Sequence, residues 1–169
     1  DQSLGDFIPS WSSTGKAAIT VSNLLNVRTA MDLIGDPDGD GYPDGSDLYE
    51  SNDQLALSLN RPLIGTPGEK LYTYSNADVV IAGELVRVAT GVPVSDYLAN
   101  TLGEVTGFNG DWWVDSNNQV LAYCCLDAKP RSFARFGLLY ARNGAWNGTQ
   151  LLSQAWINTS TIPARNGTY

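Results

Sequence analysis

The sequence predicts an α/β (α+β) fold that is mainly helical, because helix signals recur along the chain and only short extended stretches separate them. The strongest signal follows the Pro67-Gly68 turn, where apolar residues recur at helical spacing over 79–88 and Gly91 marks the end. A second runs from Pro130, which suits a first helical turn, to Asn143. Weaker signals predict helices over 21–29, 51–59, 93–102 and 154–159.

Composition bounds the class of protein. With 169 residues, 43% of them hydrophobic, the chain has the length and apolar content of one domain with a core. It carries 10 Lys and Arg against 18 Asp and Glu, and this net charge of -8 argues against a nucleic-acid partner. No apolar run is long enough to span a membrane, and no basic stretch followed by an apolar one stands at the N-terminus. The sequence has the form of a mature or internal fragment.

The tripeptide Tyr74-Ser75-Asn76 is the candidate catalytic element. The chain has no histidine, so a Ser-His-Asp triad and a His-ligated zinc site are excluded and a hydrolase would need another base. Tyr74 and Asn76 are expected at a helix N-terminus, where backbone N–H groups point outward. A phenol, with an ordinary pKa of about 10, becomes a useful base where a cation or helix end favours its phenolate. The alternative is a core aromatic residue beside a plain helix cap.

Three sequence blocks surround this motif: ITVSNLLNVRTAM at 19–31, PGEKLYTYSNADVVIAGELVRVATG at 67–91 and RSFARFGLLYARNGAWNGTQLLSQAWI at 131–157. Together they resemble the serine β-lactamase and penicillin-binding protein superfamily, above all its class C and esterase-like branches, which include 6-aminohexanoate-dimer hydrolases and D-alanyl-D-alanine carboxypeptidases. The resemblance spans nearly the whole chain apart from 35–47. It implies that residues 1–169 form part of a serine β-lactamase-like domain, namely its helical subdomain with short strands, and that the sheet is largely missing.

The same resemblance implies a serine hydrolase that cleaves an amide or ester through an acyl-enzyme. Tyr74 would act as base together with the lysine of an S-x-x-K motif, and Asn76 would orient the substrate. β-Lactams, D-amino peptides, other amides and simple esters all stay open as substrates. No organic cofactor is needed. Relatives usually carry an acidic residue at the position of Ser132, so a cap or ion pair is expected to be missing there.

Two motifs of that superfamily are not found in this chain. Ser13-Thr14-Gly15-Lys16 matches S-x-x-K in form, but its flanks are polar and no apolar helix carries both residues, so we interpret it as a surface loop. No K-T-G follows near Tyr169. We therefore expect the nucleophile on remaining segments of the same enzyme, which would carry the S-x-x-K and K-T-G-like motifs, and we expect this fragment alone to be inactive. The alternative is a non-catalytic, calcium-stabilised module that binds a peptide or glycan.

Residues 35–47 form an inserted acidic loop with the ligand spacing of an EF-hand, thrombospondin type 3 or dockerin calcium site. Acids stand at loop positions 1, 3, 5, 9 and 12, glycine stands at position 6, and position 7 offers a backbone carbonyl. The predicted ligands are Asp36, Asp38, Asp40, Tyr42, Asp44 and Asp47. The last is aspartate where an EF-hand has glutamate. A structural calcium ion is expected, rather than a catalytic one, and because weak sites of this kind work in millimolar calcium, the protein is expected to be secreted or periplasmic. A solvated acidic turn is the alternative.

Two pairs of neighbouring residues complete the candidates. Trp112 and Trp113 could stack on a substrate or belong to a half-buried core. Cys124 and Cys125 are adjacent and cannot form the spaced framework of a disulfide-rich domain. Because their surroundings are apolar, buried thiols are favoured over a strained vicinal disulfide. A catalytic thiol is not expected without a histidine to activate it.

Overall fold

The computed structural model of the chain describes residues 1–32, 45–69 and 74–162, with the backbone alone described for 45–47. It is mainly helical, and its strands are two residues long, which confirms the predicted fold class. The chain divides into two compact units, one formed by Asp1–Val94 and Trp112–Cys125 and the other by Ser95–Asp111 and Leu126–Tyr169. Among the described residues, no helix combines the length and apolarity needed to cross a bilayer.

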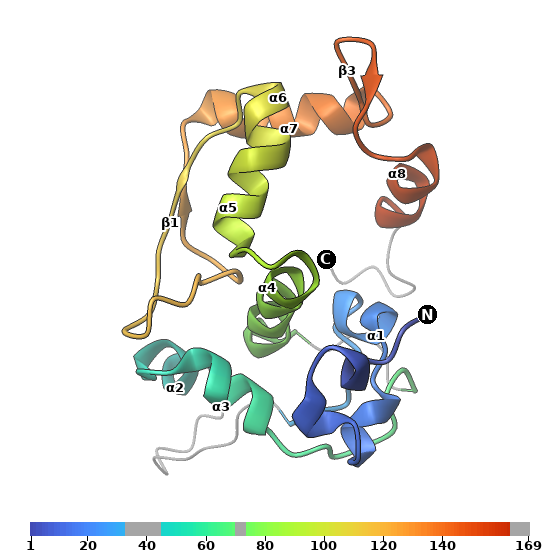
Figure 1. Cartoon of the computed structure of the whole chain (residues 1–169), viewed down its shortest axis with the longest axis vertical. Coiled ribbons are helices and arrows are strands. Elements are labelled where there is room, and N and C mark those ends of the chain that lie inside the picture. Colours follow the sequence, from blue (N-terminus) through green and yellow to red (C-terminus); the bar gives the residue numbers. More distant parts are fainter. Residues whose placement is uncertain (33–44, 70–73, 163–169) are drawn as a thin grey trace. The chain divides into compact units, whose positions relative to one another are not determined.

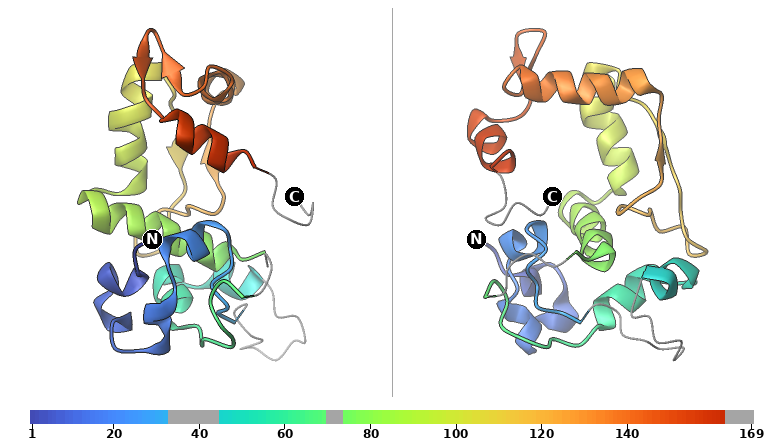
Figure 2. Two further views of the ribbon diagram at one scale, coloured as in Figure 1. Left: turned by 90° about the vertical axis from the view of Figure 1, so that its right-hand side faces the viewer. Right: turned by 180° about the vertical axis from the view of Figure 1, so that it is seen from behind.

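The first unit consists of short helices packed around one longer helix, α4 (Figure 1). Helix α4 packs against both α1 and α3. Figure 2 shows the same group of helices from two other sides. The helices in its described residues are the 3-10 helices η1 (Leu4–Asp6), η2 (Pro9–Trp11) and η3 (Gly15–Ala18) and the α-helices α1 (Val21–Leu25), α2 (Gly45–Glu50), α3 (Gln54–Asn60) and α4 (Asn76–Thr90).

Helix α4 has the limits that the sequence predicts. The Ser75 hydroxyl accepts a hydrogen bond from the backbone N–H of Asp78 and caps the first turn. At the other end Gly91 adopts a left-handed φ of 79°, a conformation that closes a helix at little cost for glycine. Ile81 is fully buried in a cluster with Leu4, Ile8, Trp11, Ile19, Leu24 and Met31. Ala77 and Val80 pack instead with Leu48, so α4 joins two apolar clusters.

Three helices of the first unit differ from the prediction: α2 was not predicted, and α1 and α3 have other limits than expected. Helix α1 begins where expected, with a capping box between Thr20 and Asn23, but it ends at Leu25 and not at residue 29. Val27 adopts a φ of 50°, in the left-handed region that a continuing helix cannot use. Helix α3 begins at Gln54 rather than at residue 51, because the Asp53 carboxylate accepts from the backbone of Ala56 and fixes the first turn there.

The second unit begins with a helical segment that is longer than predicted. Helix α5 (Val94–Leu98) continues through a π-helical turn (Ala99–Gly103) into α6 (Glu104–Thr106). The helical segment thus extends to Thr106, four residues beyond the predicted end at 102. The helix ends where Gly107 adopts a φ of 69°. The chain then forms β1 (Asp111–Trp112), which pairs with β2 (Leu126–Asp127).

The C-terminal part of the second unit follows the sequence signals closely. Helix α7 (Pro130–Ala141) has proline in its first turn, as predicted, and α8 (Gln154–Ser160) is capped by Ser153. Between them β3 (Ala145–Trp146) and β4 (Thr149–Gln150) form an antiparallel hairpin (Figure 2). Its two loop residues, Asn147 and Gly148, have φ values of 47° and 85°, as an Asn-Gly hairpin turn requires.

Ser132, on α7, makes a local contact of its own where relatives were expected to carry an acid. Its side chain is 1% exposed. The hydroxyl donates to Asn109 Oδ1 over 2.8 Å and accepts from the Asn109 backbone N–H over 3.3 Å. The hydroxyl thus fixes the segment before β1 to the first turn of α7 without a charge.

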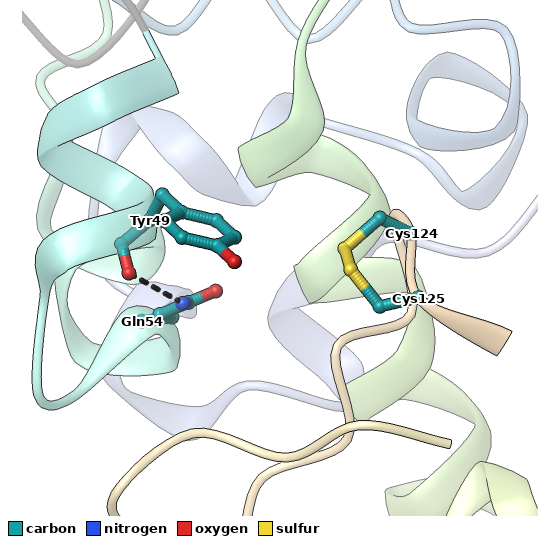
Figure 3. Close-up of a disulfide and its surroundings, with 4 residues drawn as sticks. All are labelled: Tyr49, Gln54, Cys124 and Cys125. Atoms are coloured by element: carbon teal, nitrogen blue, oxygen red, sulfur yellow. Dashed lines mark hydrogen bonds between the residues drawn. A yellow bond between two sulfur atoms is a disulfide. The ribbon is translucent and has the colours of Figure 1, made fainter. Parts of the chain in front are cut away.

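Cys124 and Cys125 form a vicinal disulfide, so the prediction of buried thiols is wrong (Figure 3). Neither residue is buried. Cys125 adopts a φ of 67°, a left-handed conformation that turns the chain at this point. The apolar flanks therefore do not bury the pair. Figure 3 also shows the ring of Tyr49 and the side chain of Gln54 beside each other, with Gln54 Nε2 donating to the Tyr49 carbonyl over 3.4 Å.

Candidate functional site

The N-terminus of α4 brings Tyr74 and Asn76 together, one on each side of the capping residue Ser75. The Tyr74 side chain is 58% exposed, so it is not a core aromatic residue. Asn76 is the first residue of the helix and is partly buried. The first-turn N–H groups and the positive end of the helix dipole lie at the same place. The geometry thus offers a surface phenol beside a side-chain amide and a helix terminus that favours negative charge.

Beneath this tripeptide lies a buried ion pair. Arg61 Nη2 is 2.5 Å from Asp78 Oδ1, and both side chains are 2% exposed. Asp78 belongs to the first turn of α4, where the helix dipole favours an acid. Thr29 Oγ1 donates to the other carboxylate oxygen over 2.9 Å, so each oxygen of Asp78 has a partner. Buried charges are tolerated only when they are satisfied in this manner.

The guanidinium of Arg61 also makes three further hydrogen bonds. Its Nε donates to the Ser58 carbonyl over 3.1 Å at the end of α3. Its Nη1 donates to the Asp32 carbonyl over 2.9 Å and to Ser75 Oγ over 3.2 Å. The rigid fork of arginine suits such simultaneous contacts. Arg61 therefore ties α3 and the segment after α1 to the residue between Tyr74 and Asn76.

The segment before the disulfide follows α4 toward this same end. A Cβ at Gly83 would lie 2.7 Å from the Ala122 Cβ, so the segment around Ala122 is in close contact with α4 halfway along the helix. The next residue, Tyr123, packs on the cluster that contains Ala77 and Val80, in the first turns of α4. Burial raises the pKa of the Tyr123 phenol, which the neighbouring Gln54 side chain only partly offsets.

Ser13 and Lys16 do not form a nucleophilic pair in the structure. Ser13 is exposed, and Lys16 lies in the short helix η3 with its ammonium group donating to the Leu59 carbonyl over 2.7 Å. The same ammonium lies 5.0 Å from the centre of the Trp11 ring. Burial, and secondly the charge of Arg61, lower the pKa of Lys16. The interpretation as a surface loop therefore agrees with the exposed Ser13, whereas Lys16 lies in a short helix and is partly buried.

The tryptophan pair is divided between two environments. Trp112 is partly buried in β1, whereas the Trp113 side chain is 50% exposed. The backbone N–H of Trp113 donates to the Cys125 carbonyl over 3.0 Å, so the backbone at Trp113 pairs with the disulfide turn. An exposed indole is available for stacking. A substrate-binding role for Trp112 and Trp113 stays a prediction.

The predicted calcium ligands lie outside the part of the chain that the structure describes. This holds for Asp36, Asp38, Asp40, Tyr42 and Asp44, and for the side chain of Asp47, whose backbone belongs to α2. Among the described side chains, no group of three or more His, Cys, Asp or Glu could hold a metal ion. The calcium site therefore stays a prediction from loop spacing.

The sequence did not single out Arg61, Asp78 or Thr29. Arg61 preceded Pro62 and marked only the end of a helix signal, and Asp78 was one acid in a helix. The one local signal is that Asp78 is an acid in the first turn of the helix, where the helix dipole favours negative charge. This signal does not indicate which residue pairs with Asp78. The three residues come from segments up to 49 positions apart, so the contact depends on the tertiary fold.

A mainly helical unit with Tyr-x-Asn at the start of its longest helix defines the helical part of a β-lactamase-like domain. The chain belongs to the β-lactamase family, whose model matches residues 1–160. No curated protein sequence matches the chain.

Three solved structures with the same fold illustrate the likeness. A protein from Bacillus anthracis assigned as a 6-aminohexanoate-dimer hydrolase superposes with a TM-score of 0.81 at 18% identity, over 95% of this chain and 46% of that one. A protein from Bacteroides dorei assigned as a β-lactamase gives 0.74 at 17% identity, over 100% and 50%. A D-stereospecific amidohydrolase from Streptomyces gives 0.59 at 19% identity, over 96% and 59%. This chain thus spans about half the length of the structures it resembles, and at such identity the likeness concerns fold alone.

Proposed function

We propose that this chain is the helical part of a serine hydrolase that cleaves an amide or an ester through an acyl-enzyme. The observation that carries the proposal is the exposed phenol of Tyr74 at the start of α4, next to Asn76, in a chain of the β-lactamase family. Membership of a hydrolase family favours this function over a non-catalytic binding module. The names of two of the similar structures, an amide-dimer hydrolase and an amidohydrolase, favour an amide substrate.

The proposed reaction uses a serine and a lysine from segments outside this chain. The serine oxygen attacks the substrate carbonyl while its proton passes to the Tyr74 phenolate, with the lysine favouring that charge state. Tyr74 returns the proton to the leaving amine or alcohol, and the acyl-enzyme forms. Water, deprotonated by the same phenolate, then releases the acid and regenerates the serine. The Asn76 amide donates to the substrate and holds its carbonyl in line for attack.

The inserted loop 35–47 is proposed to hold a structural calcium ion through Asp36, Asp38, Asp40, Tyr42, Asp44 and Asp47. Its spacing supports the proposal: alternate carboxylates surround one hard cation, and glycine permits the bend. Because weak calcium sites fill in millimolar calcium, we propose that the protein works outside the cytoplasm, as a secreted or periplasmic enzyme.

Tyr74→Phe in the intact protein tests the hydrolase proposal. The turnover of chromogenic esters, amides and cephalosporins should fall by about 10²- to 10⁴-fold, as expected for loss of a general base. The melting temperature should stay unchanged, because the side chain is exposed. Tyr97→Phe, on an exposed tyrosine of α5, is the matched control and should keep full activity. Near-full activity of Tyr74→Phe would overturn the proposal.

A further inference from the structure

Ser75 is the point at which a buried charge network meets the proposed catalytic motif. Its hydroxyl accepts two hydrogen bonds, one from the backbone N–H of Asp78 and one from Nη1 of Arg61, each over 3.2 Å. An ordinary N-cap accepts only from its own helix, as Ser153 does from the N–H of Trp156 on α8. The additional donor at Ser75 comes from outside the helix.

The extended backbone at Ser75 determines how the Tyr74 side chain is directed relative to the Ser75 hydroxyl. With φ at -152° and ψ at 104°, Ser75 is extended. Side chains that flank an extended residue point away from the side that the residue itself faces. Because the Ser75 hydroxyl faces the buried Arg61, the side chain of the preceding Tyr74 is turned to the opposite side, and Asn76 begins the helix directly after the anchored residue. The exposure of Tyr74 agrees with this orientation.

The anchor is itself held from several directions. Arg61 is bound by the carbonyls of Ser58 and Asp32, and Asp78 is bound by Thr29. These contacts leave the guanidinium little freedom to rotate or shift relative to α4. A buried ion pair contributes little net stability compared with apolar residues of the same volume, so stability alone is a weak reason for it to occupy this place. Holding a neighbouring residue in one position is a reason that the geometry supplies.

We propose that Arg61 and Asp78 are positioning residues which, through Ser75, fix Tyr74 and Asn76 in the orientation needed for catalysis. The inference rests on the proposed hydrolase function. Neither Arg61 nor Asp78 is proposed to contact the substrate. Misplacing a reacting group by about 1 Å can lower the rate about 10²-fold, so a small loss of orientation should be visible in kcat.

Ser75→Ala in the intact protein tests the proposal, with Ser153→Ala as matched control. Both substitutions remove a serine N-cap that accepts from the third backbone N–H of its helix, so both should lower the melting temperature. Ser75→Ala should lower it more, because Nη1 of Arg61 also loses an acceptor. Only Ser75→Ala should lower kcat, by tenfold or more with little change in KM, and Ser75→Thr, which keeps the hydroxyl, should restore it. Equal activity of Ser75→Ala and Ser153→Ala would overturn the positioning role.

A double variant separates this proposal from the proposed function. If Ser75 acts through Tyr74 and Asn76, Ser75→Ala should slow the enzyme much less in the Tyr74→Phe background than in the parent protein. A full, undiminished effect in that background would show that Ser75 acts by another route and would overturn the inference while the function stands. If instead Tyr74→Phe alone keeps full activity, the hydrolase assignment fails, and the inference fails with it.

Discussion

The guanidinium of Arg61 lies 2.5 Å from the carboxylate of Asp78 in a place where both side chains are 2% exposed. Removing one charge would leave the other buried without an opposite charge to compensate it. We therefore expect Asp78→Asn to lower the free energy of unfolding by about 3–5 kcal/mol. Urea denaturation of the intact protein measures this change.

Replacement of both charges gives the control for that variant. Arg61→Met combined with Asp78→Leu leaves no unpaired charge, although the carbonyls of Ser58 and Asp32 lose a donor. The double variant should therefore lose less stability than the sum of its two single substitutions. Strict additivity of the two losses would contradict the view that the pair is coupled. An unaltered stability of Asp78→Asn would show that the charge is not buried in solution.

Tyr123 gives a prediction about alkaline pH. Burial is the main cause that raises the pKa of its phenol, so the folded chain keeps the proton where the unfolded chain, with a pKa of about 10, loses it. The unfolded state then binds fewer protons, and stability falls as the pH rises above about 10. Tyr123→Phe should lessen this fall. The free energy of unfolding, measured from pH 8 to 11, tests this prediction, with Tyr97→Phe at an exposed position as control. Parallel curves for the parent protein and Tyr123→Phe would contradict the prediction.

Local signals predicted the elements that local contacts determine. Ser75 and Gly91 cap the two ends of α4, where the sequence indicates a helix start and its end, and Asn147-Gly148 is a pair that favours the tight turn between β3 and β4. Each depends on residues that are near in sequence: a cap that accepts from the same helix, or glycine and asparagine that tolerate positive φ. The Tyr-x-Asn motif was found for the same reason, since its three residues are contiguous.

The sequence failed where the fold, and not the local pattern, decides the conformation. The apolar and polar spacing of 21–29 suits a helix, yet Val27 takes a left-handed conformation and α1 stops at Leu25. Cys125 likewise takes a positive φ, and the thiols join. No spacing rule pairs Arg61 with Asp78, because their contact arises only when the end of α3 packs against the start of α4. The Tyr-x-Asn motif could therefore be predicted from the sequence, whereas the buried Arg61–Asp78 pair beneath it could not.

The loop 35–47 gives the last prediction, which follows from its ligand spacing. A ligand that binds only the folded state raises the free energy of unfolding, by about 2.7 kcal/mol when its free concentration is about 100 times the dissociation constant. Calcium should therefore raise the melting temperature of the intact protein, and EDTA should reverse the rise. Asp38→Ala combined with Asp40→Ala removes two of the predicted carboxylate ligands and should abolish the response.

A matched pair of substitutions distinguishes a calcium site from the general effect of charge. Asp96→Ala combined with Glu104→Ala removes the same two negative charges from exposed positions on α5 and α6. This control should keep the full calcium response, because neither residue belongs to the loop. A response that both double variants lose equally would indicate screening of the net charge of -8 by a divalent cation. A melting temperature that calcium and EDTA leave unchanged in the parent protein would reduce the loop to a solvated acidic turn.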